Sequence, residues 1–572
     1  MKARLACLAI GILMLAALLP AHAAVTVPGC ADASSQGGEW RSAGGSLSGD
    51  RFQPDEHQIN ASTAGNIGKA WVFRTGNAER SNGTPILNGG GFDNTPVVAD
   101  GCVFLATTTG WVMALNADTN PATGASTGKQ RVVWATQLQG AALSLRSNII
   151  TGSPTVENGV VYVGVTRPGA PAKYDEHGIM TAPATGPYVA ALDENTGAEM
   201  WESVVDAGQT DSGIGASPTY FNGKIFQGWY GSEGTIPDPG TALPARGGYA
   251  ILDASPTCDP ATFTLPSVCF NAAPGATGGT RLVHEYTISD AEMAAGYRGA
   301  SVWCTAAFDP DTNYLYACGG NPANKKSQSN GGEPRYANAL LKIDGNPSRA
   351  SWGKIVGSYK GNNDQYFPGL DQQPACDNLG DKVVVIWSVP CLQLDLDFGA
   401  SPSLFKVRVG NGTTFETRTL VGDLQKSGVY HAVNADDMSK AWTALVGSPC
   451  AACNASSPAV DAALGIANQV YTFATQPGQL VGLSADQGRY RWVLPDPDPD
   501  HFESVTTANG VVYALDTQGN LTMVNASNGL LLGKRILSQD VGAAATSASS
   551  QGLAVARNSL YIAQSDSLIV LR

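Results

Sequence analysis

The chain has 572 residues, of which 43% are hydrophobic and only 15% are charged. Its net charge of −13 at pH 7 argues against nucleic acid or an anionic membrane surface as the main partner. The low charge and the 67 glycines suit many short strands joined by tight turns.

The first 23 residues have the features of a secretory signal peptide. Lys2 and Arg4 precede an apolar run over residues 5–19, and residues 21–23 (Ala-His-Ala) provide a small-residue cleavage site. The apolar run is short for a helix that spans a membrane. We therefore expect a mature chain that starts near Ala24, has no membrane span, and is periplasmic or secreted.

The cysteines support an oxidising compartment. Removing Cys7 leaves ten of the 11 cysteines in the mature chain, an even number. Pairing of near neighbours is the economical arrangement, and it gives Cys258 with Cys269, Cys304 with Cys318, Cys376 with Cys391, and Cys450 with Cys453. Cys30 and Cys102 then remain for each other. Cys450 and Cys453 have the spacing of a covalent haem site, but Asn454 stands where a His is required, so we expect no c-type haem there.

A phrase made of an apolar strand, Asp or Asn, a turn and Trp recurs along the chain. Its copies occupy residues 114–134, 191–201, 432–442 and 482–492. Self-similarity at a period of roughly 40 to 50 residues is typical of stacked units that cannot bury a face alone.

Eight strand openings define the repeating units, and several of them contain Ser-Pro or Thr-Pro. They lie at residues 95–98, 152–156, 216–219, 303–306, 400–403, 457–460, 504–506 and 553–555. The last unit is cut short at Arg572, whereas a spare strand at residues 69–73 precedes the first unit. A ring closed by that N-terminal strand would remove the exposed edge. The sequence therefore predicts an all-β fold, an eight-bladed β-propeller of four-stranded blades, as a single domain over residues 24–572.

The repeated Trp resembles the docking tryptophan of the quinoprotein dehydrogenases, eight-bladed propellers that carry pyrroloquinoline quinone (PQQ) and a metal in a central funnel. The segment Trp40-x-x-x-Gly44, followed by Arg51-Phe52-x-Pro54, resembles the N-terminal signature of that family. The repeat alone also fits cofactor-free propellers that serve as scaffolds in outer-membrane or protein assembly. Residues outside the repeat therefore decide between the two readings.

Two segments resemble the metal-binding and quinone-binding parts of the family. Glu233 ends a strand in a Gly-x-Glu pattern, where the resemblance implies a metal ligand. Trp303 begins a stretch that ends in Gly320-Asn321-Pro322. The resemblance implies that the indole of Trp303 forms the floor under the quinone and that Asn321 binds the metal.

The segment Leu394-Asp395-Leu396-Asp397-Phe398-Gly399-Ala400 resembles the part of the family that carries the catalytic Asp. Similarity to membrane glucose dehydrogenases makes Asp395 the general base, whereas the register of the methanol and ethanol enzymes makes Asp397 the base. We favour Asp395 and count both residues as candidate metal ligands. Lanthanide-dependent relatives carry a second Asp two residues after the base, so we expect Ca²⁺ and keep a lanthanide ion open.

Lys426 lies in a Lys-x-Gly-x-Tyr segment that resembles the family's Lys-x-Gly-x-x-Tyr, in which Lys or Arg binds the quinone oxygens. Asp93 and Arg146 are weaker candidates for contact with the cofactor. Alcohol and methanol dehydrogenases of this fold cap the quinone with a disulfide between adjacent cysteines, and this chain has no Cys-Cys pair. The sequence is in this respect similar to polyvinyl alcohol dehydrogenases and other members that lack the cap.

The resemblance implies a PQQ-dependent and metal-dependent alcohol dehydrogenase. Its substrate would be a small or polymeric alcohol, and its electrons would pass to a separate acceptor such as a cytochrome c. The alternatives are the assembly scaffold and a propeller hydrolase or lyase that uses funnel carboxylates without a quinone.

Overall fold

The structure is a computed structural model. It describes residues 25–32, 36–138, 150–177, 179–209, 212–231, 245–264, 266–295, 297–321, 334–361, 396–410, 414–448, 454–462, 465–475, 477–496, 503–541 and 552–572. The expected signal peptide lies outside these residues. Among the described residues, no helix is long and apolar enough to cross a membrane.

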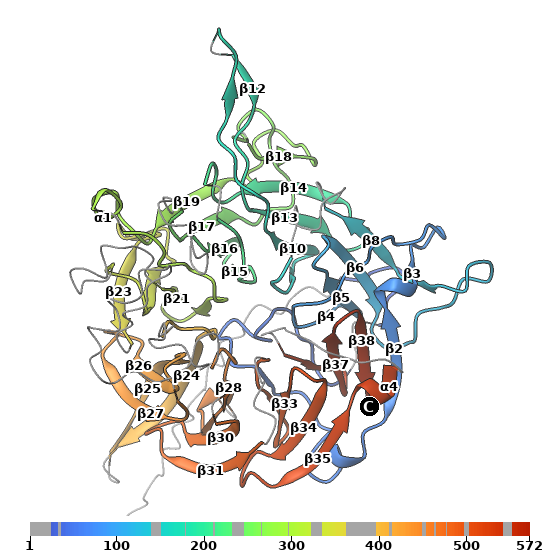
Figure 1. The fold of residues 1–572 in the computed structure, drawn as a ribbon, viewed down its shortest axis with the longest axis vertical. Helices are drawn as coiled ribbons and strands as arrows, with labels where there is room; N and C mark the ends of the chain where they lie inside the picture. The colour runs from blue at the N-terminus through green and yellow to red at the C-terminus, as the bar shows by residue number, and fades with distance from the viewer. Residues whose placement is uncertain are drawn as a thin grey trace, which may run out of the picture.

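Eight sheets of antiparallel strands stand around a central axis (Figure 1). Blade 1 contains β4 (Val97–Ala99), β5 (Cys102–Ala106), β6 (Trp111–Asn116) and β8 (Trp134–Gln137). Blade 2 contains β9 (Thr155–Glu157), β10 (Val160–Val165), β13 (Tyr188–Asp193) and β14 (Glu199–Val204), with β18 (Val268–Cys269) on its outer edge. Blade 3 contains β15 (Thr219–Phe221), β16 (Lys224–Trp229), β17 (Gly248–Asp253) and β19 (Arg281–Tyr286). Blade 4 contains β20 (Ala307–Asp309), β21 (Tyr314–Gly319), β22 (Ala339–Asp344) and β23 (Ile355–Lys360).

The second half of the ring repeats this pattern. Blade 5 contains β24 (Ser403–Gly410), β25 (Phe415–Leu424), β26 (Val429–Asn434) and β27 (Lys440–Leu445). Blade 6 contains β28 (Ala459–Asp461), β29 (Gln469–Ala474), β30 (Gln479–Ser484) and β31 (Tyr490–Pro495). Blade 7 contains β32 (Thr506–Ala508), β33 (Val511–Leu515), β34 (Asn520–Asn525) and β35 (Leu531–Ile536), and β1 (Phe52–Gln53) pairs in parallel with β32. Blade 8 contains β36 (Ala554–Ala556), β37 (Ser559–Gln564), β38 (Ser567–Leu571) and β2 (Lys69–Arg74).

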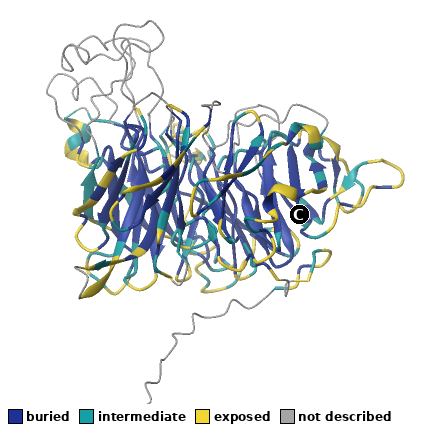
Figure 2. Cartoon of the chain, turned by 90° about the horizontal axis from the view of Figure 1, so that it is seen from below, coloured by how far each residue is buried: buried dark blue, intermediate teal, exposed yellow. Residues whose placement is uncertain are grey.

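The remaining elements are short and lie between or outside the blades. They are β3 (Ala78–Glu79), β7 (Gln130–Arg131), β11 (Lys173–Tyr174), β12 (Met180–Ala182), the 3-10 helices η1 (Ala64–Asn66) and η2 (Thr75–Asn77), and the helices α1 (Asp290–Ala294) and α4 (Ser538–Val541). Strands are buried throughout the body of the ring, and most exposed residues lie in its connections (Figure 2).

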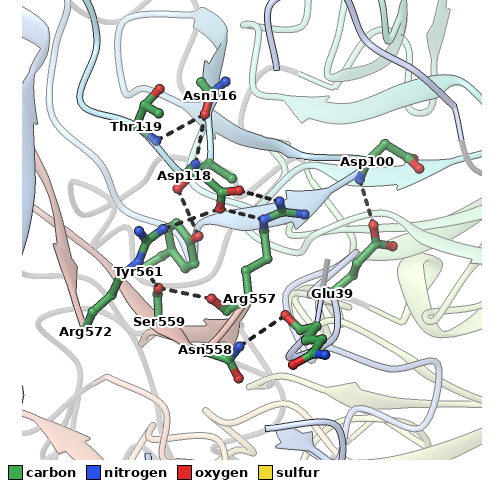
Figure 3. A network of polar contacts seen from close by, with 12 residues as sticks. Glu39, Asp100, Asn116, Asp118, Thr119, Arg557, Asn558, Ser559, Tyr561 and Arg572 are labelled. Atoms are coloured by element: carbon green, nitrogen blue, oxygen red, sulfur yellow. Dashed lines mark hydrogen bonds and ion pairs between the residues drawn. The ribbon is translucent and has the colours of Figure 1, made fainter. Parts of the chain in front are cut away.

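The predicted propeller and its closure are confirmed. The N-terminal strand β2 pairs antiparallel with the C-terminal strand β38, from Lys69 opposite Leu571 to Arg74 opposite Ser567. Next to this joint, Arg557 of blade 8 binds Asp118 of blade 1 through Nε at 2.9 Å and Nη2 at 2.6 Å (Figure 3). Charge-assisted bonds of this two-pronged kind are strong and directional, so they fix the last blade against the first.

The repeated Trp joins a blade to the next at four of the eight junctions. The indole Nε1 atoms of Trp134, Trp201, Trp442 and Trp492 donate to backbone oxygens of Glu194, Ser255, Ala485 and Ala526 at 2.8 to 3.0 Å. Each acceptor lies in a turn of the following blade. A Cβ placed on Gly197 would lie 2.4 Å from Cε3 of Trp134, so the glycine of this turn is needed for close packing.

Hydroxyl residues in the strand openings of blades 2 to 6 form an arc around the axis. Backbone N–H groups of Ser153, Ser217, Thr305 and Ser401 donate to the hydroxyl of the matching residue in the next blade, namely Ser217, Thr305, Ser401 and Ser457, at 2.8 to 3.1 Å. These bonds satisfy buried backbone donors that have no ladder partner at the centre of the ring. The recurring hydroxyl residue is therefore a device that joins neighbouring blades.

Residues 37–53, which we call the belt, run around the inside of the ring. The amides of Val98, Val156, Phe308, Leu404, Val460 and Thr507 donate to the belt carbonyls of Trp40, Arg41, Leu47, Ser48, Asp50 and Arg51 at 2.7 to 2.9 Å. Both belt ends meet blade 8, where Arg557 N–H donates to the Gly37 oxygen at 3.0 Å and Gln53 Nε2 donates to the Val555 oxygen at 2.9 Å. The belt thus completes one turn inside the propeller.

Arg51 anchors the belt between blades 7 and 8. Its Nε donates to the Val505 oxygen at 2.8 Å, and its Nη2 donates to Thr506 Oγ1 and the Leu553 oxygen, both at 3.2 Å. The side chain is buried, and burial lowers the pKa of its guanidinium to about 9. The Arg of the predicted N-terminal signature is therefore a structural anchor in this chain.

Three of the predicted disulfides are present. They join Cys30 to Cys102, Cys258 to Cys269, and Cys304 to Cys318. The pairs predicted for Cys376 with Cys391 and Cys450 with Cys453 lie outside the described residues.

Candidate active site

Three predicted site residues meet where blades 4 and 5 adjoin. The ammonium Nζ of Lys426 lies 2.6 Å from Oδ1 of Asp397, and it lies 4.6 Å from the ring centre of Trp303. The side chains of Lys426 and Asp397 are 7% and 0% exposed. The sequence separates Trp303 from Lys426 by more than a hundred positions, and the fold brings them into contact.

Backbone hydrogen bonds hold Lys426 against Asp397. Lys426 lies in the turn between β25 and β26, where Gly428 N–H donates to the Gln425 oxygen at 2.9 Å and Gly428 has a φ of +77°. Lys426 N–H also donates to the backbone oxygen of Asp397 at 3.0 Å. The two residues are therefore joined through both their main chains and their side chains. A Cβ on Gly399 would lie 3.1 Å from Cε of Lys426, so this glycine leaves room for the lysine stem.

Trp303 lies in the segment that leads into β20. Val302 N–H donates to the Trp229 oxygen of blade 3 at 3.0 Å, and Gly320 N–H donates to the Ser301 oxygen at 2.8 Å. The indole is partly buried against the core of blade 4. This placement gives the site a flat aromatic wall next to a buried cation.

Asn321 lies two residues after the end of β21. It is 6% exposed, and its backbone oxygen accepts from Ala300 N–H at 2.7 Å. The Trp303 segment and the Asn321 segment therefore run beside each other. An amide oxygen is a suitable ligand for a hard cation such as Ca²⁺.

Sequence reasoning missed a second buried carboxyl near the site. Asp423 on β25 is fully buried, and burial followed by the charge of Asp397 raises the pKa of Asp423 well above its usual range. A carboxyl group inside an apolar strand was the available signal, since Leu420, Val421 and Leu424 surround it in the sequence.

A polar network that the sequence did not indicate supports the Lys426 turn. Gln425 Oε1 accepts from Ser427 Oγ at 2.7 Å and lies 3.1 Å from Nε2 of His431. Nδ1 of His431 lies 3.1 Å from the hydroxyl of Tyr359. Burial lowers the pKa of His431 to about 4, so this imidazole is neutral at pH 7.

Asp93, a weaker candidate for contact with the cofactor, is not joined to this cluster by any contact among the described residues. Asp93 precedes blade 1, and burial raises its pKa, but within the described part of the chain no contact links it to Lys426, Asp397 or Trp303. Glu233, Arg146 and Asp395 lie outside the described residues, so their roles stay predictions.

A cavity of about 690 Å³ lies elsewhere in the ring, between the belt and the inner strands of blades 2 to 5. Its walls include Leu47 of the belt, Tyr220 and Phe308. The cavity contains none of the predicted site residues. The Lys426 cluster is the candidate active site, because it combines buried charge with an aromatic surface.

Comparison with known families gives two matches. Residues 40–126 match the β-propeller domain of glucose, ethanol and alcohol dehydrogenases. Residues 414–571 match the outer membrane protein assembly factor BamB. The first match begins in the belt and extends through β6.

One curated relative is the quinohemoprotein alcohol dehydrogenase ADH IIB of Pseudomonas putida, which is 26% identical over 326 residues. The alignment covers 55% of this chain and 39% of the relative, so the chain spans about two fifths of that relative's length.

Solved structures show the same fold at low identity. Quinohemoprotein alcohol dehydrogenase from Comamonas testosteroni superposes with a TM-score of 0.61 at 15% identity, covering 93% of this chain and 80% of that one. A europium-containing methanol dehydrogenase superposes with a TM-score of 0.58 at 13% identity, covering 92% and 90%. The predicted resemblance to the PQQ-dependent quinoprotein dehydrogenases is therefore confirmed by a family match, a homologous alcohol dehydrogenase and the eight-bladed fold.

Proposed function

We propose that this protein is a quinoprotein oxidoreductase that oxidises an alcohol group with PQQ as the electron acceptor. The observation that carries the proposal is the buried ion pair of Lys426 and Asp397 beside the Trp303 indole. Buried charges are costly to hold in a protein, so a pair of this kind beside a flat apolar surface is a candidate for chemistry.

The described residues fit a planar anionic cofactor with a bound cation. Trp303 offers a flat surface, Lys426 offers a positive charge, and Asn321 offers an amide oxygen for a metal ion. PQQ, when bound, supplies a two-electron acceptor that no side chain provides. Described residues thus offer suitable chemistry for the plane of the cofactor, for a negative charge on it and for one ligand of the cation.

Asp397 is the general base in this proposal. Its carboxylate would take the hydroxyl proton of the alcohol, and the Lys426 ammonium 2.6 Å away offers that carboxylate a charge-assisted hydrogen bond. The ion pair supports the register in which Asp397 is the base, rather than the Asp395 register that the sequence favoured. Lys426 would then stabilise negative charge that develops beside it.

We propose Ca²⁺ as the metal ion, held by Asn321, Asp397 and the predicted ligand Glu233, with Asp395 as a further candidate. When Asp397 is the base, the residue two positions later is Gly399, which has no carboxylate to offer a trivalent ion. This register therefore favours Ca²⁺ over a lanthanide ion.

The substrate is an alcohol, and we propose that bulky or polymeric alcohols are included. The chain has no adjacent-cysteine pair, a feature that it shares with polyvinyl alcohol dehydrogenase-like members, and this likeness supports the extension. A separate electron acceptor of the cytochrome c kind would reoxidise the protein in the periplasm, in agreement with the signal peptide and the disulfides.

The test is reconstitution of the purified protein with PQQ and CaCl₂, and in parallel with LaCl₃. Binding of PQQ is measured by calorimetry, and turnover is measured by dye reduction with a panel of primary, secondary and polymeric alcohols. PQQ binding with alcohol-dependent dye reduction is the expected result. Absence of PQQ binding under both conditions would refute the proposal.

The second candidate function is a cofactor-free scaffold for outer-membrane or protein assembly. The match of residues 414–571 to the assembly factor BamB favours it. A scaffold gains nothing from a buried Lys-Asp pair beside an indole. The reconstitution therefore separates the two candidates, because a scaffold would show neither quinone binding nor dye reduction.

A further inference from the structure

The Cys304–Cys318 disulfide lies inside the candidate active site. Cys304 directly follows Trp303, and Cys318 precedes Asn321 by three residues. The disulfide therefore connects the segment that carries Trp303 to β21, the strand that precedes Asn321.

The disulfide spans a gap in the backbone pairing of blade 4. The ladder between β20 and β21 ends where Ala307 lies opposite Tyr316. Beyond this point the two segments meet again only near Asn321, where Gly320 N–H bonds the Ser301 oxygen and Ala300 N–H bonds the Asn321 oxygen. Between these two zones the disulfide is the covalent connection, and Cys318 N–H also donates to Sγ of Cys304 at 2.8 Å.

The sulfur atoms belong to the core rather than to the surface. Cys304 is 5% exposed and Cys318 is 0% exposed. Both pack in the cluster that contains Phe398 of the Asp397 segment, and Trp303 packs against the same cluster. Any change in the spacing of the two sulfurs therefore acts on close-packed neighbours that include the site.

The other described disulfides lie away from the site. Cys30–Cys102 attaches the N-terminal segment to blade 1. Cys258–Cys269 closes a loop in the connection between β17 and β19, and its Cys269 pairs with Trp201 on the outer edge of blade 2. The second loop spans 11 residues, close to the 14 residues that separate Cys304 from Cys318. It is therefore a matched control.

We propose that the Cys304–Cys318 disulfide is a positioning element of the quinone and metal site. The disulfide sets the separation between the Trp303 indole and the Asn321 amide. At that separation the indole supports the plane of the cofactor and the amide oxygen reaches the cation. This inference rests on the proposed function of the site. It assigns a role to a covalent bond in a chain that lacks the adjacent-cysteine cap.

The test compares the parent protein with two double variants, Cys304→Ser with Cys318→Ser and Cys258→Ser with Cys269→Ser. PQQ affinity is measured by calorimetry over a series of CaCl₂ concentrations, and the thermal midpoint of each apoprotein is recorded. We expect both variants to lose thermal stability, because each releases a loop of similar length. We expect only the site variant to bind PQQ about tenfold or more weakly and to need more Ca²⁺ for half-maximal binding.

A general structural role predicts a different pattern. Loss of either disulfide would then lower the thermal midpoint, and PQQ affinity and its Ca²⁺ dependence would be equal in both variants. That result would overturn this inference and leave the proposed function standing. A parent that binds no PQQ would overturn the proposed function and this inference with it. If the Ser variant does not reach the parent's circular dichroism spectrum, the Cys304→Ala with Cys318→Val variant, which fills the buried space with apolar atoms, is put through the same measurements.

Discussion

Lys426 and Asp397 form an ion pair of 2.6 Å in a place that excludes nearly all solvent from both side chains. Removing one partner of a buried pair leaves an uncompensated charge and typically costs about 3–5 kcal/mol. Lys426→Met is therefore expected to destabilise the fold, whereas Asp397→Asn keeps an oxygen that the ammonium can still contact. The Asn variant is the better probe of chemistry.

We expect Asp397→Asn to retain PQQ binding and to lose turnover by a factor on the order of 10²–10⁴, the usual contribution of a general base. Asp395→Asn is the comparison, and we expect it to retain most of the activity. The measurements are dye reduction with the best alcohol and PQQ affinity by calorimetry. The reverse pattern, an active Asp397→Asn and an inactive Asp395→Asn, would restore the register that the sequence favoured.

Trp303 is expected to act through its flat ring rather than through its size. Trp303→Ala removes the aromatic surface and should weaken PQQ binding by about tenfold or more, which corresponds to about 1.4 kcal/mol. Trp303→Phe keeps an aromatic face and should lose much less affinity. Trp492→Phe changes an interblade tryptophan elsewhere in the ring, and it should leave PQQ affinity unchanged. Equal affinities for the Ala and Phe variants at position 303 would contradict a stacking role.

The sequence predicted the ring because its evidence is local and repeated. The Trp of the phrase makes one kind of interblade contact in several blades, and the hydroxyl residue of the openings makes another. Because each contact recurs, the spacing of these residues could be recognised from the sequence alone. The belt has no such signature, because it binds the inner strands through backbone carbonyls that every residue has. Arg51 was noticed only through a family resemblance, and its contacts with Val505 and Leu553 lie more than 450 positions away.

The candidate site was predictable to the extent that motifs carry it. Trp303, Asn321 and Lys426 were found from short segments that resemble the family. Our proposal of Asp397 as the base rests on its contact with Lys426, and such a contact between blade 5 segments cannot be inferred from sequence spacing. Asp423 escaped notice because no family motif marks it, and its only local signal is a carboxyl group among the apolar residues of a strand.

Gly197 tests whether the interblade contact needs the absence of a side chain. Gly197 has a φ of +70°, and Gly128 has a φ of +68° at the matching turn of blade 1, where a Cβ would meet nothing within 4 Å. Gly128→Ala should therefore cost only the backbone strain, about 1 kcal/mol. Gly197→Ala should cost about 1–3 kcal/mol more, because its Cβ would press on Trp134. Free energies of unfolding from urea titrations check this difference, and equal losses would show that backbone conformation alone selects the glycine.

Asp50 makes the belt sensitive to pH. Its carboxylate accepts from Ser46 Oγ at 2.8 Å and from Ser48 Oγ at 3.1 Å, but burial raises its pKa to about 6. In the unfolded chain the pKa of an Asp carboxyl is about 3.9. Below about pH 4 the Asp50 carboxyl is therefore protonated in both the folded and the unfolded state. Between about pH 4 and pH 6 only the folded state still binds the proton, so the free energy of unfolding falls as the pH rises through that window.

Asp50→Asn removes this titration and keeps an oxygen for the two serines. We expect the variant to match the parent near pH 4 and to be more stable above pH 6, by at most about 3 kcal/mol and by less where solvent still reaches the carboxylate. Asp437 is the control of opposite sign, since hydrogen bonds from Ser439 hold its pKa below the usual range. The stability of Asp437→Asn relative to the parent should thus fall as the pH rises towards about 4, and it should stay constant above that pH. Urea titrations must therefore extend from below about pH 4, where the Asp437 slope lies, through the window between about pH 4 and pH 6, where the Asp50 slope lies. A flat difference for Asp50→Asn would show that the belt accommodates the charged carboxylate without cost.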